Sequence, residues 1–278
     1  MKNIKFVKLI CLFCLLLLLP AAGGCALSSY SVEELRILYP KAIENSLNEE
    51  LYYWKETVNQ PDYSSWRTCN IYAEMNNKFE VIRNENGDFS NMKIDVYDEY
   101  NKKGTYKALC GKSESTSGGE AKSILFENDY DDLNNPVHYR KTEILPMEFI
   151  ESDAFKSKYS LDALLRELDY LSVNDMDFDT DSKIMEHKGK IVKFSFKVNE
   201  DYLQKYNQKF GKKSIFVGSK YAVIEFAYDR VASFVVYSEE KLGKNLTVDK
   251  EIYKLEIVYY GPVINIPSYD SGVWAEIK

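Results

Sequence analysis

Histidine is scarce in this chain, and the chain lacks a positive net charge. Only two histidines occur among 278 residues, and the sequence has no nucleophile elbow, phosphate-binding loop or histidine-rich zinc pattern. Hydrolases commonly place a histidine beside the nucleophile, so a hydrolase is the weakest hypothesis. The formal charge is −7 at pH 7, and a surface of this sign is a poor partner for nucleic acid. We therefore expect no catalysis, no cofactor and no nucleic-acid partner.

The leader of the chain lacks an apolar run long enough to cross a membrane. Residues 1–24 carry three lysines, then the apolar run Leu9–Leu19, then Pro20 and four small residues before Cys25. This order is typical of an export signal. The run has 11 residues, whereas a membrane-spanning helix needs about 20, so a permanent transmembrane anchor is the weaker interpretation.

The small residues before the cysteine add a second signal. The stretch Ala22-Gly23-Gly24-Cys25 resembles a bacterial lipobox, although its first position is most often leucine and here is alanine. The resemblance implies a diacylglyceryl group on Cys25 and cleavage just before it. We expect residues 1–24 to be a lipoprotein signal peptide and residues 25–30 a lipidated tether on the extracytoplasmic face of a bacterial cell membrane. Ordinary secretion after signal cleavage is the alternative.

Cysteine is also rare once the leader is removed. Cys69 and Cys110 then remain beside Cys25, and both lie on predicted strands. An exported pair can form one disulfide, and the alternative is two small buried thiols. The sequence leaves both readings open.

The mature part is acidic and rich in tyrosine. The leader carries three lysines and no acidic residue, so its removal takes the formal charge from −7 to about −10. The chain has 22 tyrosines and 14 phenylalanines. Tyrosine combines apolar area with a polar tip, which suits strand faces, apolar grooves and wet interfaces.

The first half of the mature chain predicts a helix followed by a meander. Ser31 and Glu34 have capping-box spacing, and apolar residues recur at three and four up to Val58, with Pro40 predicting a kink or a second helix. From Trp66 the period changes to two. We expect strands at 67–75, 78–83, 91–99, 105–111 and 122–127, without crossover helices and therefore antiparallel, followed by a loop at 129–139.

The second half predicts leucine-bearing helices and a second group of strands. Leucines at helical spacing follow Ser160, and Asn199 can cap a helix that ends at Gly211. Strands are expected at 191–198, 221–228, 231–237 and 252–260, with a tight hairpin at Asp229-Arg230. We expect a single domain over residues 31–267 and a C-terminal tail over 268–278.

This succession, with the closing Tyr259-Tyr260-Gly261-Pro262, resembles the half-barrel lipoproteins, namely the LolA-like proteins and the mycobacterial LppX/LprG group. The resemblance implies an α+β fold in which a large curved antiparallel sheet carries helices on its concave face. It also implies that this face can hold acyl chains or another apolar molecule. The candidate cavity lining is Trp54, Leu164, Leu168, Phe194, Phe196, Tyr206 and Phe226.

One stretch has the spacing of a metal loop. Counted from Asp175, acids fall at positions one, three, five and seven, with Glu186 at position twelve, as in a calcium loop. Thr180 stands where such a loop needs glycine, and the alternation equally describes a strand with one wet face. Calcium binding by Asp175, Asp177, Asp179 and Glu186 is therefore a weak alternative, and we expect no metal.

Two functional hypotheses follow. The first is a lipid-anchored protein that binds or carries a lipid or another apolar molecule in the concave sheet. The second is a non-catalytic surface module that docks an envelope protein.

Overall fold

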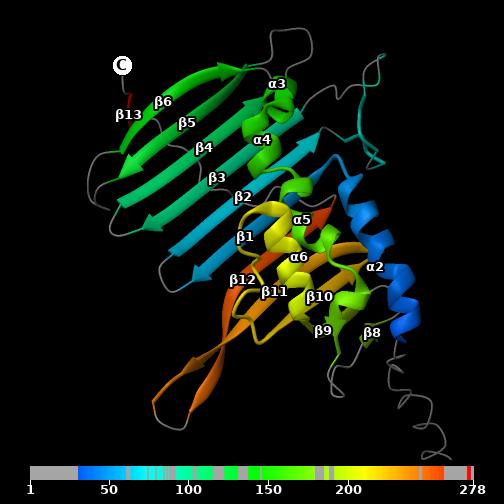
Figure 1. Cartoon of the computed structure of the whole chain (residues 1–278). Helices are drawn as coiled ribbons and strands as arrows, with labels where there is room; N and C mark the ends of the chain where they lie inside the picture. The colour runs from blue at the N-terminus through cyan, green and yellow to red at the C-terminus, as the bar shows by residue number, and fades with distance from the viewer. Residues whose placement is uncertain are drawn as a thin grey trace, which may run out of the picture.

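The chain folds into one large sheet with helices packed against it (Figure 1). The expected fold class, α+β with a large antiparallel sheet, is confirmed. The structure, a computed structural model, describes residues 31–60, 63–73, 75–78, 80–83, 85, 87, 92–102, 105–114, 122–130, 137–144, 146–178, 185–187, 191–243, 246–259 and 274–276.

Two meanders join edge to edge to make the sheet. The strand order is β13-β6-β5-β4-β3-β2-β1-β12-β11-β10-β9-β7, and β8 also pairs with β9. The meanders meet where β1 runs antiparallel to β12, with Tyr52 opposite Tyr259, so strands from the two ends of the chain lie side by side. The strands are β1 (Tyr52–Gln60), β2 (Tyr63–Ala73), β3 (Met92–Lys102), β4 (Thr105–Glu114), β5 (Lys122–Tyr130), β6 (Val137–Ile144), β7 (Met176–Asp177), β8 (Met185–His187), β9 (Ile191–Val198), β10 (Tyr221–Ala227), β11 (Arg230–Lys241), β12 (Thr247–Tyr259) and β13 (Trp274–Glu276).

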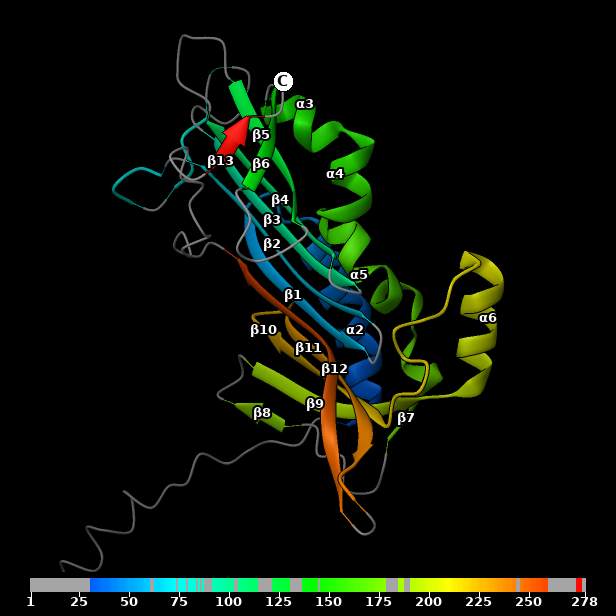
Figure 2. The same cartoon turned by 90° about the vertical axis from the view of Figure 1, so that its left-hand side faces the viewer.

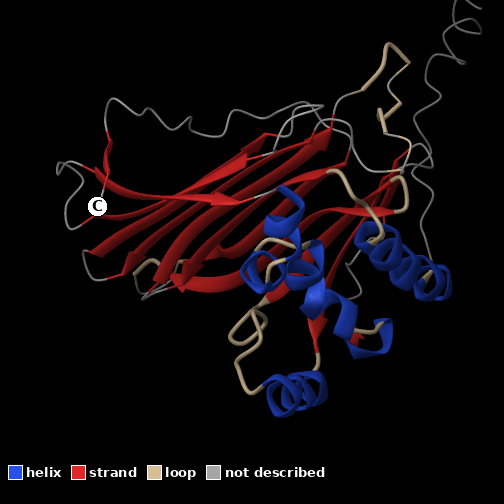
Figure 3. Ribbon diagram, turned by 90° about the horizontal axis from the view of Figure 1, so that it is seen from above, coloured by secondary structure: helices blue, strands red, loops and turns tan. Residues whose placement is uncertain are grey.

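The helices lie on one face of this twisted sheet (Figures 2 and 3). They are α2 (Val32–Leu47), α3 (Pro146–Glu151), α4 (Asp153–Lys158), α5 (Leu161–Tyr170), the short 3₁₀ turn η1 (Val173–Asp175) and α6 (Glu200–Phe210). Among the described helices, none is both long enough and apolar enough to cross a membrane.

Local signals position the helix ends as predicted. The Ser31 hydroxyl accepts from the Glu34 amide at 3.2 Å, and the Glu34 carboxylate accepts from the Ser31 amide at 2.8 Å, which completes the capping box of α2. Asn199 caps α6 through the Tyr202 amide. Gly211 ends α6 with φ at +62°, a backbone angle that glycine adopts at little cost.

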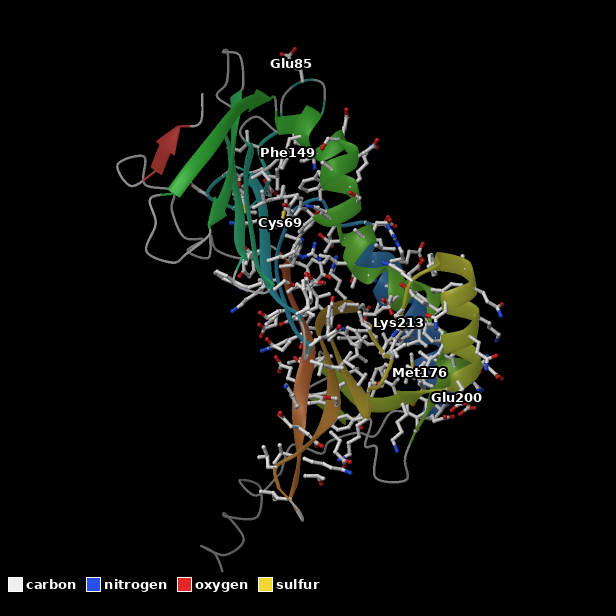
Figure 4. The ribbon with its side chains drawn as sticks, turned by 60° about the vertical axis from the view of Figure 1, so that its left-hand side comes forward. Cys69, Glu85, Phe149, Met176, Glu200 and Lys213 are labelled. Carbon is white, nitrogen blue, oxygen red and sulfur yellow. The ribbon has the colours of Figure 1, made fainter. Side chains whose placement is uncertain are left out.

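The core lies between the sheet and the helices, where side chains fill the space (Figure 4). Strand β9 shows the principle, because Val192, Phe194 and Phe196 are buried while Lys193 and Lys197 are exposed. The period of two found in the sequence therefore becomes one apolar and one wet face.

The helical pattern predicted over Leu51–Val58 is wrong. The helix ends at Leu47, and residues 52–60 form β1. Its apolar residues fit both periods, since Trp54 and Val58 are four apart but also stand on the same face of a strand. The segment forms a strand because it pairs with β2 on one side and with β12 on the other.

Pro40 lies within a single helix. The helix α2 runs through Pro40 without being divided into two helices. Proline has no N–H, so the carbonyl of Arg36 loses its usual partner in the helix.

Three further expectations need correction. The described residues of Lys78–Arg83 belong to no strand, and Val81 makes an isolated antiparallel bridge with Met75. The loop expected at 129–139 ends earlier, because β6 begins at Val137. Trp274–Glu276, assigned to the tail, pairs in parallel with Val137–Tyr139 at the edge of the sheet. The pairing of β13 with β6 joins residues far apart in the sequence, which a local pattern cannot register.

The expected tight hairpin is present, but one residue earlier than predicted. Ala227 pairs with Arg230, so Tyr228 and Asp229 form the turn. Both have positive φ, 52° and 59°, as a type I′ turn requires.

Candidate functional site

The seven side chains predicted to line a cavity are all buried in the hydrophobic core. Their exposed fractions run from 0% for Trp54 and Tyr206 to 8% for Leu164. The ring of Phe194 lies 5.7 Å from that of Phe226 and 5.9 Å from that of Phe196, centroid to centroid. These aromatic side chains therefore pack against one another and fill the space that the prediction left open for a ligand.

Trp54 is one of the side chains that fill the space between the sheet and the helices. Its indole Nε1 donates to the Tyr159 carbonyl at 2.9 Å, and its ring stacks on the Tyr159 ring. The Arg67 guanidinium lies 5.7 Å from the Trp54 ring centroid. Trp54 thus ties β1 to the residue between α4 and α5, which is a structural role.

A pocket of about 580 Å³ lies elsewhere, between α2 and the segment formed by the end of α5 and η1. None of the seven predicted residues lines it. The lining residues come from one stripe of α2 with its C-cap and from one continuous stretch that begins in the last turn of α5: Arg36, Tyr39, Pro40, Ile43, Glu44, Leu47, Asn48, Asp169, Tyr170, Leu171, Ser172, Val173 and Asn174.

The pocket has an apolar base and a polar rim. Ile43, Leu171 and Val173 are buried, whereas Arg36 and Asp169 are exposed. Pro40 also lies on this stripe, where it has no N–H to donate to the Arg36 carbonyl. The site can therefore hold an apolar group at its base and a polar group at its mouth.

Tyr39 fixes the two walls of the pocket relative to each other. Its hydroxyl donates to the Leu168 carbonyl at 2.8 Å, and its ring is 2% exposed. Burial, assisted by the negative charges of Asp169 and Asp175, raises the pKa of this hydroxyl well above its ordinary value. Tyr39 is therefore a neutral donor at any physiological pH, and its hydrogen bond joins α2 to α5.

A buried ion pair lies on the sheet below α4 and α5. Arg67 of β2 donates to the Glu56 carboxylate of β1 through Nε at 2.5 Å and also through a terminal guanidinium nitrogen. The Tyr253 hydroxyl donates to the same carboxylate at 3.0 Å, and Arg67 also reaches the Lys158 carbonyl. These contacts join β1, β2, β12 and the end of α4, so the cluster holds these elements together.

A second buried carboxylate holds a loop to α5. Glu167 accepts from the Ser214 hydroxyl and from the Ile215 amide at 2.9 Å. Burial raises the pKa of the Glu167 carboxyl, and the bonds from Ser214 and Ile215 oppose that shift only in part. The Tyr202 hydroxyl donates to the backbone carbonyl of Glu167, so α6 and the loop after it are both fastened to α5.

The acids of the proposed calcium loop do not converge. Asp177 lies opposite Lys197 and Glu186 opposite Val192, so they stand about 16 Å apart along β9. Asp175 accepts from the Ser172 amide and hydroxyl as part of η1. Within the described residues no group of acids, histidines and cysteines could hold a metal ion, while Asp179 lies outside them.

The structure does not bring the two cysteines together. Cys69 lies on β2 opposite Val96, and Cys110 lies on β4 opposite Tyr97, so β3 separates them. Two strand spacings amount to about 10 Å, beyond the roughly 7 Å that a disulfide allows between Cα atoms. Cys69 is fully buried, as the alternative reading expected.

The residue predicted to carry the lipid, Cys25, lies outside the described residues. Comparison with known proteins adds no identification. The chain matches no family model and no curated protein.

Sequence reasoning missed the pocket but had one signal for it. Pro40 interrupts a helical stripe whose neighbours Arg36, Glu44 and Asn48 are polar where a packed stripe would be apolar. A proline with polar residues one turn before and after it marks a helix face that does not pack closely. The second wall of the pocket follows α5, and only the tertiary structure brings it near.

Proposed function

We propose that this protein is a lipid-anchored lipoprotein of the bacterial cell envelope that binds a small amphipathic molecule in the pocket between α2 and the end of α5. The observation that carries the proposal is that pocket, with its buried apolar base and polar rim. Its volume of about 580 Å³ falls within the roughly 300–1,000 Å³ typical of small-molecule sites.

The lining limits the ligand to one class. Ile43, Leu171 and Val173 favour a single apolar chain or ring, and Arg36 offers a cation to an acidic head group. Glu44 and Asp169 on the same rim disfavour a head group of high negative charge. A fatty acid or a monoacyl lipid meets these conditions.

The half-barrel architecture of LolA and LppX type belongs to the same proposal. The one-sided helical layer on a broad antiparallel sheet supports it. The site differs from the one that the resemblance implies, because the aromatic side chains of β9 and β10 occupy the sheet face. The ligand would therefore lie between two helices and not on the sheet.

The anchor and the pocket lie next to each other along the chain. The lipid on Cys25 and its short tether lead directly into α2, which forms one wall of the pocket. A tether of about five residues reaches at most about 18 Å, so the pocket would stay near the membrane from which an acyl ligand comes.

Native mass spectrometry of the lipoprotein, purified from its own membranes in mild detergent, tests the proposal. We expect a diacylglyceryl adduct on the peptide that begins at Cys25 and a bound molecule of lipid mass on the folded protein. Asn174→Trp should remove the bound molecule, because the side chain at this exposed rim position would enter the pocket.

Asn207→Trp is the matched control. It makes the same substitution at an exposed position of α6, outside the pocket, and should keep the bound molecule. An empty wild-type protein, or equal occupancy in both variants, would contradict ligand binding at this site. A stoichiometric protein in place of the small molecule would favour the docking function instead. An unmodified Cys25 peptide would contradict the anchor independently.

A further inference from the structure

The strands β11 and β12 extend beyond the rest of the sheet. Pairing of β10 with β11 stops at Tyr237, and pairing of β1 with β12 reaches no further than Tyr253. Beyond these points β11 and β12 pair only with each other, to the last pair, Lys241 with Thr247. Residues 238–243 and 246–252 thus form a two-stranded arm that projects from the body (Figures 1 and 2).

The end of this arm is apolar. Leu242 is 52% exposed and Leu246 is 57% exposed, and they are two of the six large apolar side chains exposed in the described residues. The Leu242 amide donates to the Leu246 carbonyl at 2.8 Å, so the two residues are held side by side. A soluble hairpin end is more often polar, with turn residues such as asparagine, aspartate and glycine.

The charge at the arm's end opposes that of the whole chain. The sequence from 241 to 247 contains two lysines and no acid, in a chain of net charge −7. The acids lie further back along the arm, where Asp249 pairs with Lys220 at 2.8 Å and Glu240 with Lys250 at 3.6 Å. The end alone thus combines two exposed leucines with positive charge, a combination suited to an anionic lipid surface.

The base of the arm holds its direction. The rings of Tyr221 and Tyr237 stack with centroids 4.8 Å apart, and the Tyr221 hydroxyl donates to Asp249 at 3.1 Å. Lys220 contacts both Glu239 of β11 and Asp249 of β12. These contacts cross from β10 to both strands of the arm, so the arm is an extension of the sheet and not a loose loop.

The arm points the same way as the start of the first helix. In Figures 1 and 2 the N-terminal end of α2, the end of β11 and the start of β12 all lie toward the lower end of the molecule. The tether that leads to Cys25 joins α2 at that end. A protein held at Cys25 would therefore present this end to the membrane.

We propose that the end of the β11–β12 arm is a second membrane contact, in which Leu242 and Leu246 enter the interface of the bilayer that carries the lipid anchor. This inference rests on the proposed lipid anchor at Cys25. The partner is the lipid surface itself, with an anionic head-group layer that matches the lysines. Two contact points would fix the orientation of the protein on the membrane, whereas a single flexible tether would leave it free to rotate.

Tryptophan fluorescence of the full lipidated chain tests this contact. Leu242→Trp and, separately, Leu246→Trp place a probe on each strand of the arm's end. Tyr228→Trp is the matched control, because Tyr228 is 63% exposed and sits about 40 Å away at the opposite end of β11. Each protein is reconstituted into phosphatidylglycerol-containing vesicles whose acyl chains carry bromine near the head group.

The emission added by each new tryptophan is obtained by subtracting the wild-type signal. We expect bromine to quench the added emission of both arm variants severalfold more than that of Tyr228→Trp, and to find their emission shifted to the blue. Equal quenching in all three variants would overturn the membrane contact and leave the arm's end to a protein partner. Co-flotation of protein with the vesicles tests the lipid anchor separately. Protein that fails to float with the vesicles contradicts the anchor and, with it, this inference. Protein that floats but shows no quenching contradicts the arm contact alone.

Discussion

Replacing Arg67 by methionine should destabilise the protein by several kilocalories per mole. Glu56 is 6% exposed, and its carboxylate is paired with the Arg67 guanidinium and accepts from the Tyr253 hydroxyl. Removing one partner of a buried pair leaves an uncompensated charge, at a cost of about 3–5 kcal/mol. The Arg67 side chain keeps 17% of its surface exposed, so water can partly replace it, and we expect a loss near the lower bound, about 3 kcal/mol.

The double variant Glu56→Leu with Arg67→Met gives the sharper test. It removes both charges. The Tyr253 hydroxyl loses its acceptor, and the Lys158 carbonyl loses the Arg67 donor at an exposed position where water can replace it, so the expected loss is about 1 kcal/mol. Urea unfolding followed by circular dichroism measures both values. Lys41→Met is the control, since the Lys41–Asp229 pair is more than half exposed on both sides and its loss should cost less than about 0.5 kcal/mol. A double variant less stable than Arg67→Met alone would refute the reasoning.

Two more predictions concern α5 and α2. Burial raises the pKa of the Glu167 carboxyl above its ordinary value of 4.5, so the folded state binds this proton more tightly than the unfolded state does. Protonated Glu167 therefore stabilises the fold below pH 4.5, and this stabilisation is lost as the pH rises through the folded-state pKa. Glu167→Gln should remove this pH dependence. Urea unfolding midpoints measured between pH 4 and 8 should show the stability of the wild type relative to Glu167→Gln falling as the pH rises. A difference in midpoint that stays constant over this range would contradict the prediction. Ser31→Ala should lower the unfolding free energy by about 1 kcal/mol through loss of the cap of α2, and an unchanged value would show that the cap contributes nothing.

Much of the fold follows from signals that are local in the sequence. The capping pair Ser31 and Glu34, the cap at Asn199 and the glycine at 211 each depend on neighbours within a few residues, and the structure places each helix end accordingly. Alternation of polar and apolar residues likewise identifies β9 and β10. Such features need no knowledge of distant parts of the chain.

What the sequence could not predict depends on distant partners. Residues 52–58 satisfy both a helical and a strand period, and the strand forms because they pair with β12, 195 to 207 residues later in the chain. The seven predicted lining residues do lie between helices and sheet. Whether such side chains surround a cavity or fill it depends on their combined volume against the space between the layers, which no single-sequence pattern encodes.

The contacts around α2 also bear on how the pocket would bind its ligand. On one side Ser46 accepts from the Val231 amide at 2.9 Å, and Glu49 pairs with Arg230, which fixes the end of α2 to β11. On the other side Tyr39 fixes its middle to α5. Movement of the whole helix would break bonds at both places, and the Ser46 and Tyr39 bonds are buried, where an unmet donor costs about 1–3 kcal/mol. The pocket is therefore preformed, and a ligand would enter by displacing water and turning the exposed rim side chains, with α2 held in place.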